Sequence, residues 1–205
     1  MSTRIIKQQS VMRKKPRQAR SRVTVETIIQ AGARILSDEG WAGFTTNRIA
    51  DLAGVSIGSL YQYFPDKLSL VDAIRYCHLD DSITALREVR ADGLSPGEFA
   101  VELVRAVVAA HSVYPGLHRV LLDESPSSQE YRNPNSEFEI EYLSYYARVV
   151  ATYRMRQPNA ADLVAARVIS DAIDGVIHNA ARRGHINDDA MQSELVRLVS
   201  LYIGG

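Results

Sequence analysis

The chain of 205 residues has little of what marks secreted or membrane-spanning proteins. It contains a single cysteine, Cys77, so a disulfide cannot form within it. No apolar run approaches the roughly 20 residues that cross a bilayer. The basic N-terminus has no apolar segment of the kind found in secretory signals. We therefore expect a cytoplasmic protein that makes no contact with a membrane.

Motifs of common catalytic and cofactor sites are also missing. The five histidines are not spaced as a local metal-ligand cluster, and there is no HExxH motif. The glycines are scattered and form no phosphate-binding loop, and neither serine nor cysteine occupies a nucleophile elbow. We expect no metal, no cofactor and no enzymatic activity, with a helical enzyme as the alternative from a different class.

Charge is distributed unevenly, although the formal net charge is zero. Residues 1–50 hold ten Lys or Arg and three acidic residues, which leaves +7, and the remaining 155 residues carry −7. A basic end on an acidic body indicates a polyanionic partner for that end alone. Residues 1–20 are polar and basic and predict a disordered arm, which either lies along phosphates or is a solvated segment without function.

The stretch from Thr45 to Lys67 predicts two short helices joined by a tight corner. Thr45 and Ser56 can each cap a helix, and Gly54 suits the left-handed backbone of the corner. Pro65 ends the second helix after about two turns. Leu60 and Phe64 fall on the inner side of the second helix. The residues left to face outward or sideways are Ile57, Ser59, Tyr61, Gln62 and Tyr63. This is the helix-turn-helix pattern, whose hydroxyls and amides reach phosphates and base edges, and a packed helical hairpin is the alternative.

The run from Ile28 to Lys67 also resembles the N-terminal DNA-binding domain of TetR-type transcriptional regulators. The residues that carry the resemblance are Gly40-Trp41, Phe44-Thr45-Thr46, Ile49-Ala50, Ala53-Gly54-Val55-Ser56, Gly58, Leu60-Tyr61, Tyr63-Phe64 and Lys67-Leu70. By position, the residues that resemble the family's phosphate contacts are Thr46, Ser56, Tyr63 and Lys67. The candidates for base edges are Arg48, Ser59, Tyr61 and Gln62, with Gly58 kept small for close approach.

The rest of the chain predicts further helices and no strand. Expected helices cover 23–39, 67–89, 98–113, 117–122, 136–156, 159–183 and 188–202, in addition to the two short ones. Gly40 is expected to cap the first helix, and Ser95 with Glu98 to form a capping box. Trp41 and Phe44 are expected to fill the core rather than to stack on bases. The class is all-α, with about nine helices. Three parts follow: the disordered basic arm at 1–20, a three-helix helix-turn-helix domain at 21–67, and a helical ligand-binding and dimerisation domain at 68–205.

The long helix over 67–89 has no internal breaker and is predicted to join the DNA-binding end to the acidic body. The tyrosines near residue 145 either pack in a core or line a ligand cavity. The expected cavity residues are Leu79, Ile83, Leu103, Val107, His111, Tyr142, Tyr145, Tyr146, Ile173 and Ile177. Their character predicts an uncharged or weakly polar organic effector, anchored by His111 or a tyrosine hydroxyl, which tilts the long helix and releases DNA.

The last two helices have apolar stripes that either complete the core of the chain or pair two chains. The resemblance implies that they build a homodimer, because the corresponding helices do so in TetR-like proteins. The candidate interface residues are Ala165, Ala172, Gly175, Leu195, Leu198, Val199 and Tyr202. A twofold dimer reads a near-palindromic operator in double-stranded DNA. A repressor released by a small effector is expected, and the alternatives are a DNA-binding dimer without such control and a non-specific DNA-packaging protein.

Overall fold

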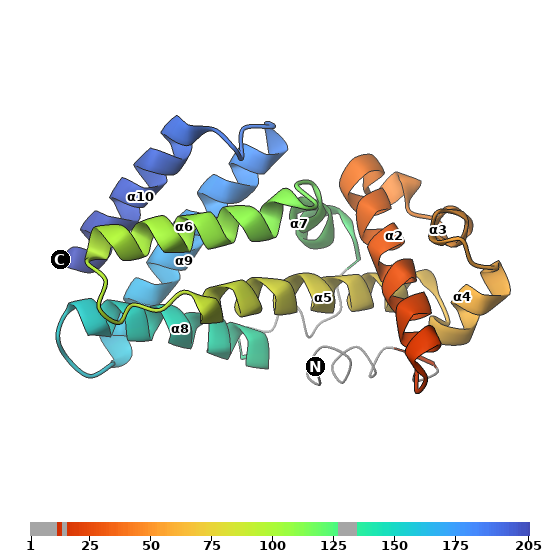
Figure 1. The fold of residues 1–205 in the computed structure, drawn as a ribbon, viewed down its shortest axis with the longest axis horizontal. Helices are drawn as coiled ribbons and strands as arrows, with labels where there is room; N and C mark the ends of the chain where they lie inside the picture. Colours follow the sequence, from red (N-terminus) through yellow and green to blue (C-terminus); the bar gives the residue numbers. More distant parts are fainter. Residues whose placement is uncertain (1–11, 14–15, 127–134) are drawn as a thin grey trace. The chain divides into compact units, whose positions relative to one another are not determined.

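The computed structural model of the chain describes residues 12–13, 16–126 and 135–205, and these residues form nine α-helices and no strand (Figure 1). The prediction of an all-α chain is confirmed. The helices belong to two compact units. The N-terminal unit comprises Met1–Asp80 and Gly116–Gln129, and the C-terminal unit comprises Asp81–Pro115 and Glu130–Gly205.

The N-terminal unit is built on α2 (Ala19–Gly43), α3 (Thr46–Ala53) and α4 (Ile57–Tyr63). The helix α2 begins before the predicted residue 23, and Gly40 interrupts its last turns with φ 68°, where the sequence predicts a capping glycine. Apolar side chains from all three helices, Ile28, Ile49 and Leu60 among them, are fully buried. Phe44 is buried with them, so this loop aromatic fills the core as expected.

The helix α5 (Lys67–Glu88) runs unbroken from the N-terminal unit into the C-terminal unit, as the sequence predicts. The N-terminal unit ends at Asp80, which lies well inside this helix. The sequence placed the boundary between the two domains earlier, at residue 67. The short α7 (Leu117–Arg119) and the π-helix η1 (Val120–Glu124) also belong to the N-terminal unit, where both pack on α2. This unit is therefore discontinuous along the chain.

The C-terminal unit consists of α6 (Pro96–Ser112), α8 (Glu137–Tyr153), α9 (Ala160–Arg182) and α10 (Asp189–Gly204), with the end of α5. Within it, α8 packs along α9 and α10 along α6 (Figure 1). Ser95 and Glu98 form the predicted capping box of α6, and Asn159 caps α9. One apolar cluster, drawn from all four helices, is the core of this unit.

Part of the predicted disordered arm lies outside the described residues, namely 1–11 and 14–15. Met12 is buried, and the backbone N–H of Arg13 donates to the carbonyl of Tyr63 at 2.8 Å. Arg20 lies inside α2, so the last two residues of the predicted arm are helical. Among the described residues, no helix is long and apolar enough to cross a membrane.

Candidate functional site

The helix-turn-helix is fixed by local hydrogen bonds that the sequence specifies. The Thr45 hydroxyl accepts from the N–H of Arg48, and the Ser56 hydroxyl accepts from the N–H of Ser59 at 3.1 Å. Gly54 ends α3 with φ 66°, a left-handed conformation that a side chain disfavours. The short helix α4 is thereby set at a defined corner from α3, which is the geometry of a recognition helix.

Polar side chains from α3 and α4 form the outer surface of this motif. Ser56, Gly58, Tyr61 and Gln62 are exposed, and Thr46, Ser59 and Lys67 are half-buried. The hydroxyl oxygens of Thr46 and Tyr61 lie 3.1 Å apart and share a hydrogen bond. The first residue of α3 and the middle of α4 therefore present hydroxyl groups side by side, ready to contact an anionic or base-edge acceptor.

The prediction that Tyr63 faces outward is wrong, because only 8 % of its surface is exposed. The buried stripe of α4 consists of Leu60, Tyr63 and Phe64, a spacing of three and four residues that lies on one helix face. The sequence interpretation assigned only Leu60 and Phe64 to that face. Any contact from Tyr63 to a phosphate has to come from the small part of its side chain that is exposed.

Lys67, at the start of α5, lies over the ring of Trp41 with its Nζ 3.6 Å from the ring centroid. This cation–π contact holds the ammonium group at one place beside the motif. Partial desolvation lowers the pKa of Lys67 from its ordinary value of 10.5. Trp41 thus does more than the core packing expected for it, since its face also positions a candidate phosphate contact.

Arg48, a candidate for base contacts, is engaged by the carboxylate of Glu39 on α2. Its side chain remains 54 % exposed, so solvent screens this ion pair. Arg48 can therefore exchange Glu39 for a DNA acceptor at small cost.

The C-terminal unit contains a polar cluster within its apolar core. The Tyr142 hydroxyl on α8 donates to the carboxyl of Asp174 on α9, at 3.0 and 3.1 Å from its two oxygens. Burial raises the pKa of Asp174 from 3.8 to about 7, against the opposing effect of the bond from Tyr142. Asp174 was not among the residues predicted from the sequence; its only signal there is an acidic side chain directly after Ile173 in an apolar stripe.

The tyrosine hydroxyls of α8 differ in what they contact. Tyr145 donates to the carbonyl of Val89 at 3.1 Å, and Tyr153 donates to that of Leu94 at 3.2 Å, so both are structural. Tyr146 is 1 % exposed, and its hydroxyl has no hydrogen-bond partner of normal geometry among the described residues. Its ring packs edge-on against Tyr142, and burial raises the pKa of Tyr146 above its ordinary value. A buried hydroxyl whose hydrogen bond is imperfect is costly, so this group calls for an explanation.

Most of the predicted cavity residues lie together in the C-terminal unit. Leu103, Val107, Tyr145, Tyr146, Ile173 and Ile177 belong to its buried cluster, with Tyr142 packed against it. Ile83 and His111 are also buried in this unit, whereas Leu79 belongs to the N-terminal unit. The His111 Nδ1 must donate to the Val107 carbonyl, 2.8 Å away, since a carbonyl only accepts. Desolvation lowers the pKa of His111, which keeps the ring neutral.

The predicted interface residues divide by burial. Ala165, Leu195 and Val199 are buried in the core of their own chain, which agrees with the alternative that the last helices complete the core. Gly175 and Leu198 are exposed, and Ala172 and Tyr202 are half-buried. The same two helices expose further large apolar side chains that are not among the predicted interface residues: Leu163, Val164, Val168 and Leu201.

Comparisons with known proteins agree with this arrangement. Residues 28–74 match the family described as "Bacterial regulatory proteins, tetR family". Residues 95–202, more than half of the chain, match "Tetracyclin repressor-like, C-terminal domain". The matched proteins are transcriptional regulators and not enzymes, so the enzyme alternative is excluded.

Individual relatives are similar over different lengths. The HTH-type transcriptional repressor KstR2 of Rhodococcus jostii (strain RHA1) is 36 % identical over 89 residues, which is 42 % of this chain and 44 % of that relative. The fatty acid degradation regulator FadR of Bacillus halodurans shares the fold at TM-score 0.68 and 18 % identity, covering 88 % of this chain and 94 % of that chain. A TetR-family regulator from Streptomyces coelicolor shares it at TM-score 0.62 and 21 % identity, covering 88 % and 98 %.

Proposed function

The chain belongs to the TetR family of bacterial transcriptional regulators, and we propose that it is a homodimeric repressor which a small ligand releases from a near-palindromic operator. Regulators of this family bind DNA and small molecules and act as dimers. The observation that carries the DNA-binding part is the exposed polar surface of α4. Tyr61 and Gln62 are exposed there, while Leu60 and Phe64 bury the opposite face.

Contacts to phosphate position the motif, and contacts to base edges select the sequence. We assign phosphate contacts to Thr46, Ser56, Tyr63 and Lys67. Base contacts fall to Arg48, Ser59, Tyr61 and Gln62, with Gly58 allowing close approach. The absence of a side chain at Gly58 leaves its surroundings open, since the nearest non-neighbouring atom to an added Cβ is the Ser56 hydroxyl at 3.9 Å.

Operator selection from a random DNA library tests this assignment. Gln62→Ala should change the preferred base at one position in each half-site, because glutamine pairs with adenine through two hydrogen bonds worth about 1–3 kcal/mol. Gln157→Ala, an exposed glutamine outside the motif, is the matched control. Selection of a defined twofold-related site distinguishes the repressor from a non-specific DNA-packaging protein. An unchanged preference in the Gln62→Ala protein contradicts the base-reading role.

The ligand-binding part of the proposal rests on the buried hydroxyl of Tyr146, which interacts with Tyr142 but makes no hydrogen bond of normal geometry among the described residues. This group lies near Asp174, whose pKa of about 7 leaves about half of the carboxyl groups protonated at neutral pH. Around them the side chains of Leu103, Ile173 and Ile177 are apolar. Such a setting suits a largely apolar or aromatic ligand with one group that hydrogen-bonds to Tyr146.

The helix α5 supplies the connection, since it is continuous from Lys67 to Glu88. A ligand that displaces its C-terminal turns changes the spacing of the two recognition helices in the dimer. Consecutive major grooves require a spacing of about 34–36 Å. A tenfold loss of operator affinity requires that the ligand prefer the mis-spaced state by about 1.4 kcal/mol.

Native mass spectrometry of the purified dimer tests the ligand proposal. A co-purified small molecule should dissociate from the native protein and should be depleted in Tyr146→Phe, which removes only the hydroxyl. Tyr114→Phe, at a half-buried tyrosine outside the polar cluster, is the control. Equal retention in both variants contradicts Tyr146 as the anchor. The native protein could instead carry no small molecule and keep a constant operator affinity in cell extract. That result supports a DNA-binding dimer without small-molecule control.

A further inference from the structure

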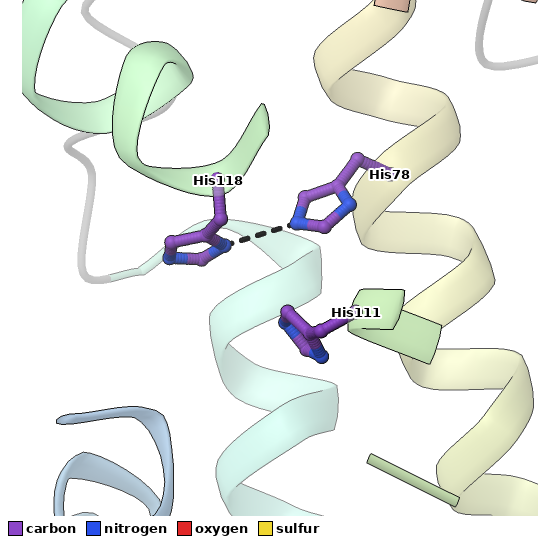
Figure 2. Close-up of side chains that lie close together, drawn as sticks. All are labelled: His78, His111 and His118. Carbon is purple, nitrogen blue, oxygen red and sulfur yellow. Dashed lines mark hydrogen bonds between the residues drawn. The ribbon is translucent and has the colours of Figure 1, made fainter. Parts of the chain in front are cut away.

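Two histidines that are far apart in the sequence meet inside the N-terminal unit. His78 on α5 and His118 on α7 are separated by 40 residues, and the His78 Nε2 lies 3.0 Å from the His118 Nδ1 (Figure 2). Both side chains are half-buried. His111, the third side chain drawn, belongs to α6 of the C-terminal unit, where its ring lies 4.9 Å from that of His178.

We propose that His78 and His118 form a binding site for a late first-row divalent metal ion such as Zn²⁺. The two facing nitrogens share one proton in the metal-free pair, because one must donate and the other accept. A metal ion can replace that proton and take both lone pairs. In a tetrahedral Zn²⁺ site, bonds of about 2.0–2.1 Å separate two nitrogens by about 3.3 Å. The observed 3.0 Å therefore has to open by only a few tenths of an ångström.

A second contact between the same two segments holds the pair in place. Arg75 precedes His78 by three residues on α5, and Leu121 follows His118 by three residues in η1. The Arg75 guanidinium donates to the Leu121 carbonyl at 2.9 Å and to the Ser125 hydroxyl at 2.8 Å. Arg75 is 1 % exposed, so this contact is shielded from water. The histidine pair thus lies about one helical turn from the buried hydrogen bonds of Arg75. These bonds hold the two segments together and so preorganise both rings for a shared ligand.

The start of α7 is also held in place, by a contact with α2. The N–H of Gly116, just before α7, donates to the hydroxyl of Ser37 on α2 at 3.2 Å. A Cβ on Gly116 would lie 2.4 Å from the Ser37 carbonyl oxygen, so the two backbones are in close contact. Metal binding at His118 would therefore stabilise a helix that packs on α2, which in turn packs on α3 of the DNA-binding motif.

The chemistry of the donors selects the class of metal. Two neutral imidazoles suit zinc, copper and nickel, whereas magnesium and calcium prefer oxygen ligands. The two imidazoles supply two ligands, and water or another donor would have to supply the remaining ones. This proposal goes beyond the proposed function and departs from the expectation, drawn from local spacing, that the chain binds no metal.

Calorimetric titration of Zn²⁺ into the untagged, EDTA-treated dimer tests the site. We expect one Zn²⁺ per chain, and at least tenfold weaker binding in His78→Gln and in His118→Gln, whose amides preserve a polar contact. His185→Gln, at an exposed histidine of the C-terminal unit, should bind as the native protein does. Circular dichroism melting without metal shows whether each variant is folded, and added Zn²⁺ should raise the melting temperature of the native protein but not of the two site variants.

Three results would overturn the proposal. The first is a Zn²⁺ affinity that survives both site substitutions. The second is an equal loss in His185→Gln, which indicates non-specific binding at surface histidines. The third is an intense near-ultraviolet thiolate absorption with Co²⁺, because it would assign the metal to the neighbouring Cys77.

Discussion

The buried carboxyl of Asp174 should make the protein less stable as pH rises from acid to neutral. Its pKa is 3.8 in the unfolded chain and about 7 in the folded one. Below pH 3.8 the group is protonated in both states and costs nothing. Between the two values the unfolded chain loses the proton while the folded chain keeps it, so the free energy of unfolding falls with rising pH. Above pH 7 the carboxyl is ionised in both states, and the full loss in the free energy of unfolding remains.

The size of this effect follows from the two pKa values. Each pH unit between them corresponds to about 1.36 kcal/mol, which gives about 4 kcal/mol in full and about 2.7 kcal/mol between pH 5 and pH 8. These are upper bounds, because the half-buried side chain keeps some contact with water. Asp174→Asn removes the titration but retains an oxygen that accepts from the Tyr142 hydroxyl. The variant should therefore gain stability over the native protein as pH rises from 5 to 8.

Urea unfolding at pH 5 and pH 8 measures this gain, with the protomer concentration held constant because dimerisation contributes to stability. Asp92→Asn, which removes an exposed carboxylate of the same unit, should show no such gain. If Asp174→Asn follows the native pH dependence, the carboxyl titrates normally in the folded state. The raised pKa of Asp174, which forms part of the setting proposed for a ligand beside Tyr146, would then be wrong.

Three further substitutions test other parts of the structure. Lys67→Ala should weaken binding to all DNA sequences alike and lower the salt slope by about one unit, measured by fluorescence anisotropy at several salt concentrations; a change in base preference would refute a phosphate contact. Val168→Glu, at a side chain 50 % exposed on α9, should shift sedimentation from dimer to monomer, whereas Val113→Glu, 68 % exposed outside α9 and α10, should not. Gly116→Ala should cost about 1–3 kcal/mol in urea unfolding because its Cβ meets the Ser37 carbonyl, and Gly97→Ala, with no contact closer than 3.8 Å, should cost less.

Features set by neighbouring residues were predictable from the sequence. The Ser95–Glu98 capping box and the left-handed Gly54 depend on a few adjacent positions, and the structure confirms both. Tyr63 was misassigned because α4 has only seven residues. Its buried face was defined by Leu60 and by Phe64 just after the helix, and Tyr63 lies beside them on that face. A longer helix would have constrained the phase better.

Contacts between distant segments were not predictable in this way. Neither residue of the pair His78 and His118 carries a local signal for the other, since 40 residues separate them. The polar contact of Asp174 with Tyr142 likewise depends on how α8 and α9 pack, which periodicity alone does not fix. The apolar periodicity of α9 also did not show which of its side chains are exposed: Ala165 is buried, whereas its immediate neighbour Val164 is exposed.

The return of α7 and η1 to the N-terminal unit limits how this protein can be divided by genetic engineering. A fragment that ends near Asp80 keeps the whole helix-turn-helix but lacks the Leu121 carbonyl and the Ser125 hydroxyl that receive Arg75. The guanidinium, 1 % exposed in the intact chain, would lose these buried acceptors. Grafting this DNA-binding half onto another effector domain therefore requires that residues 116–126 travel with it, as a second, non-contiguous insert.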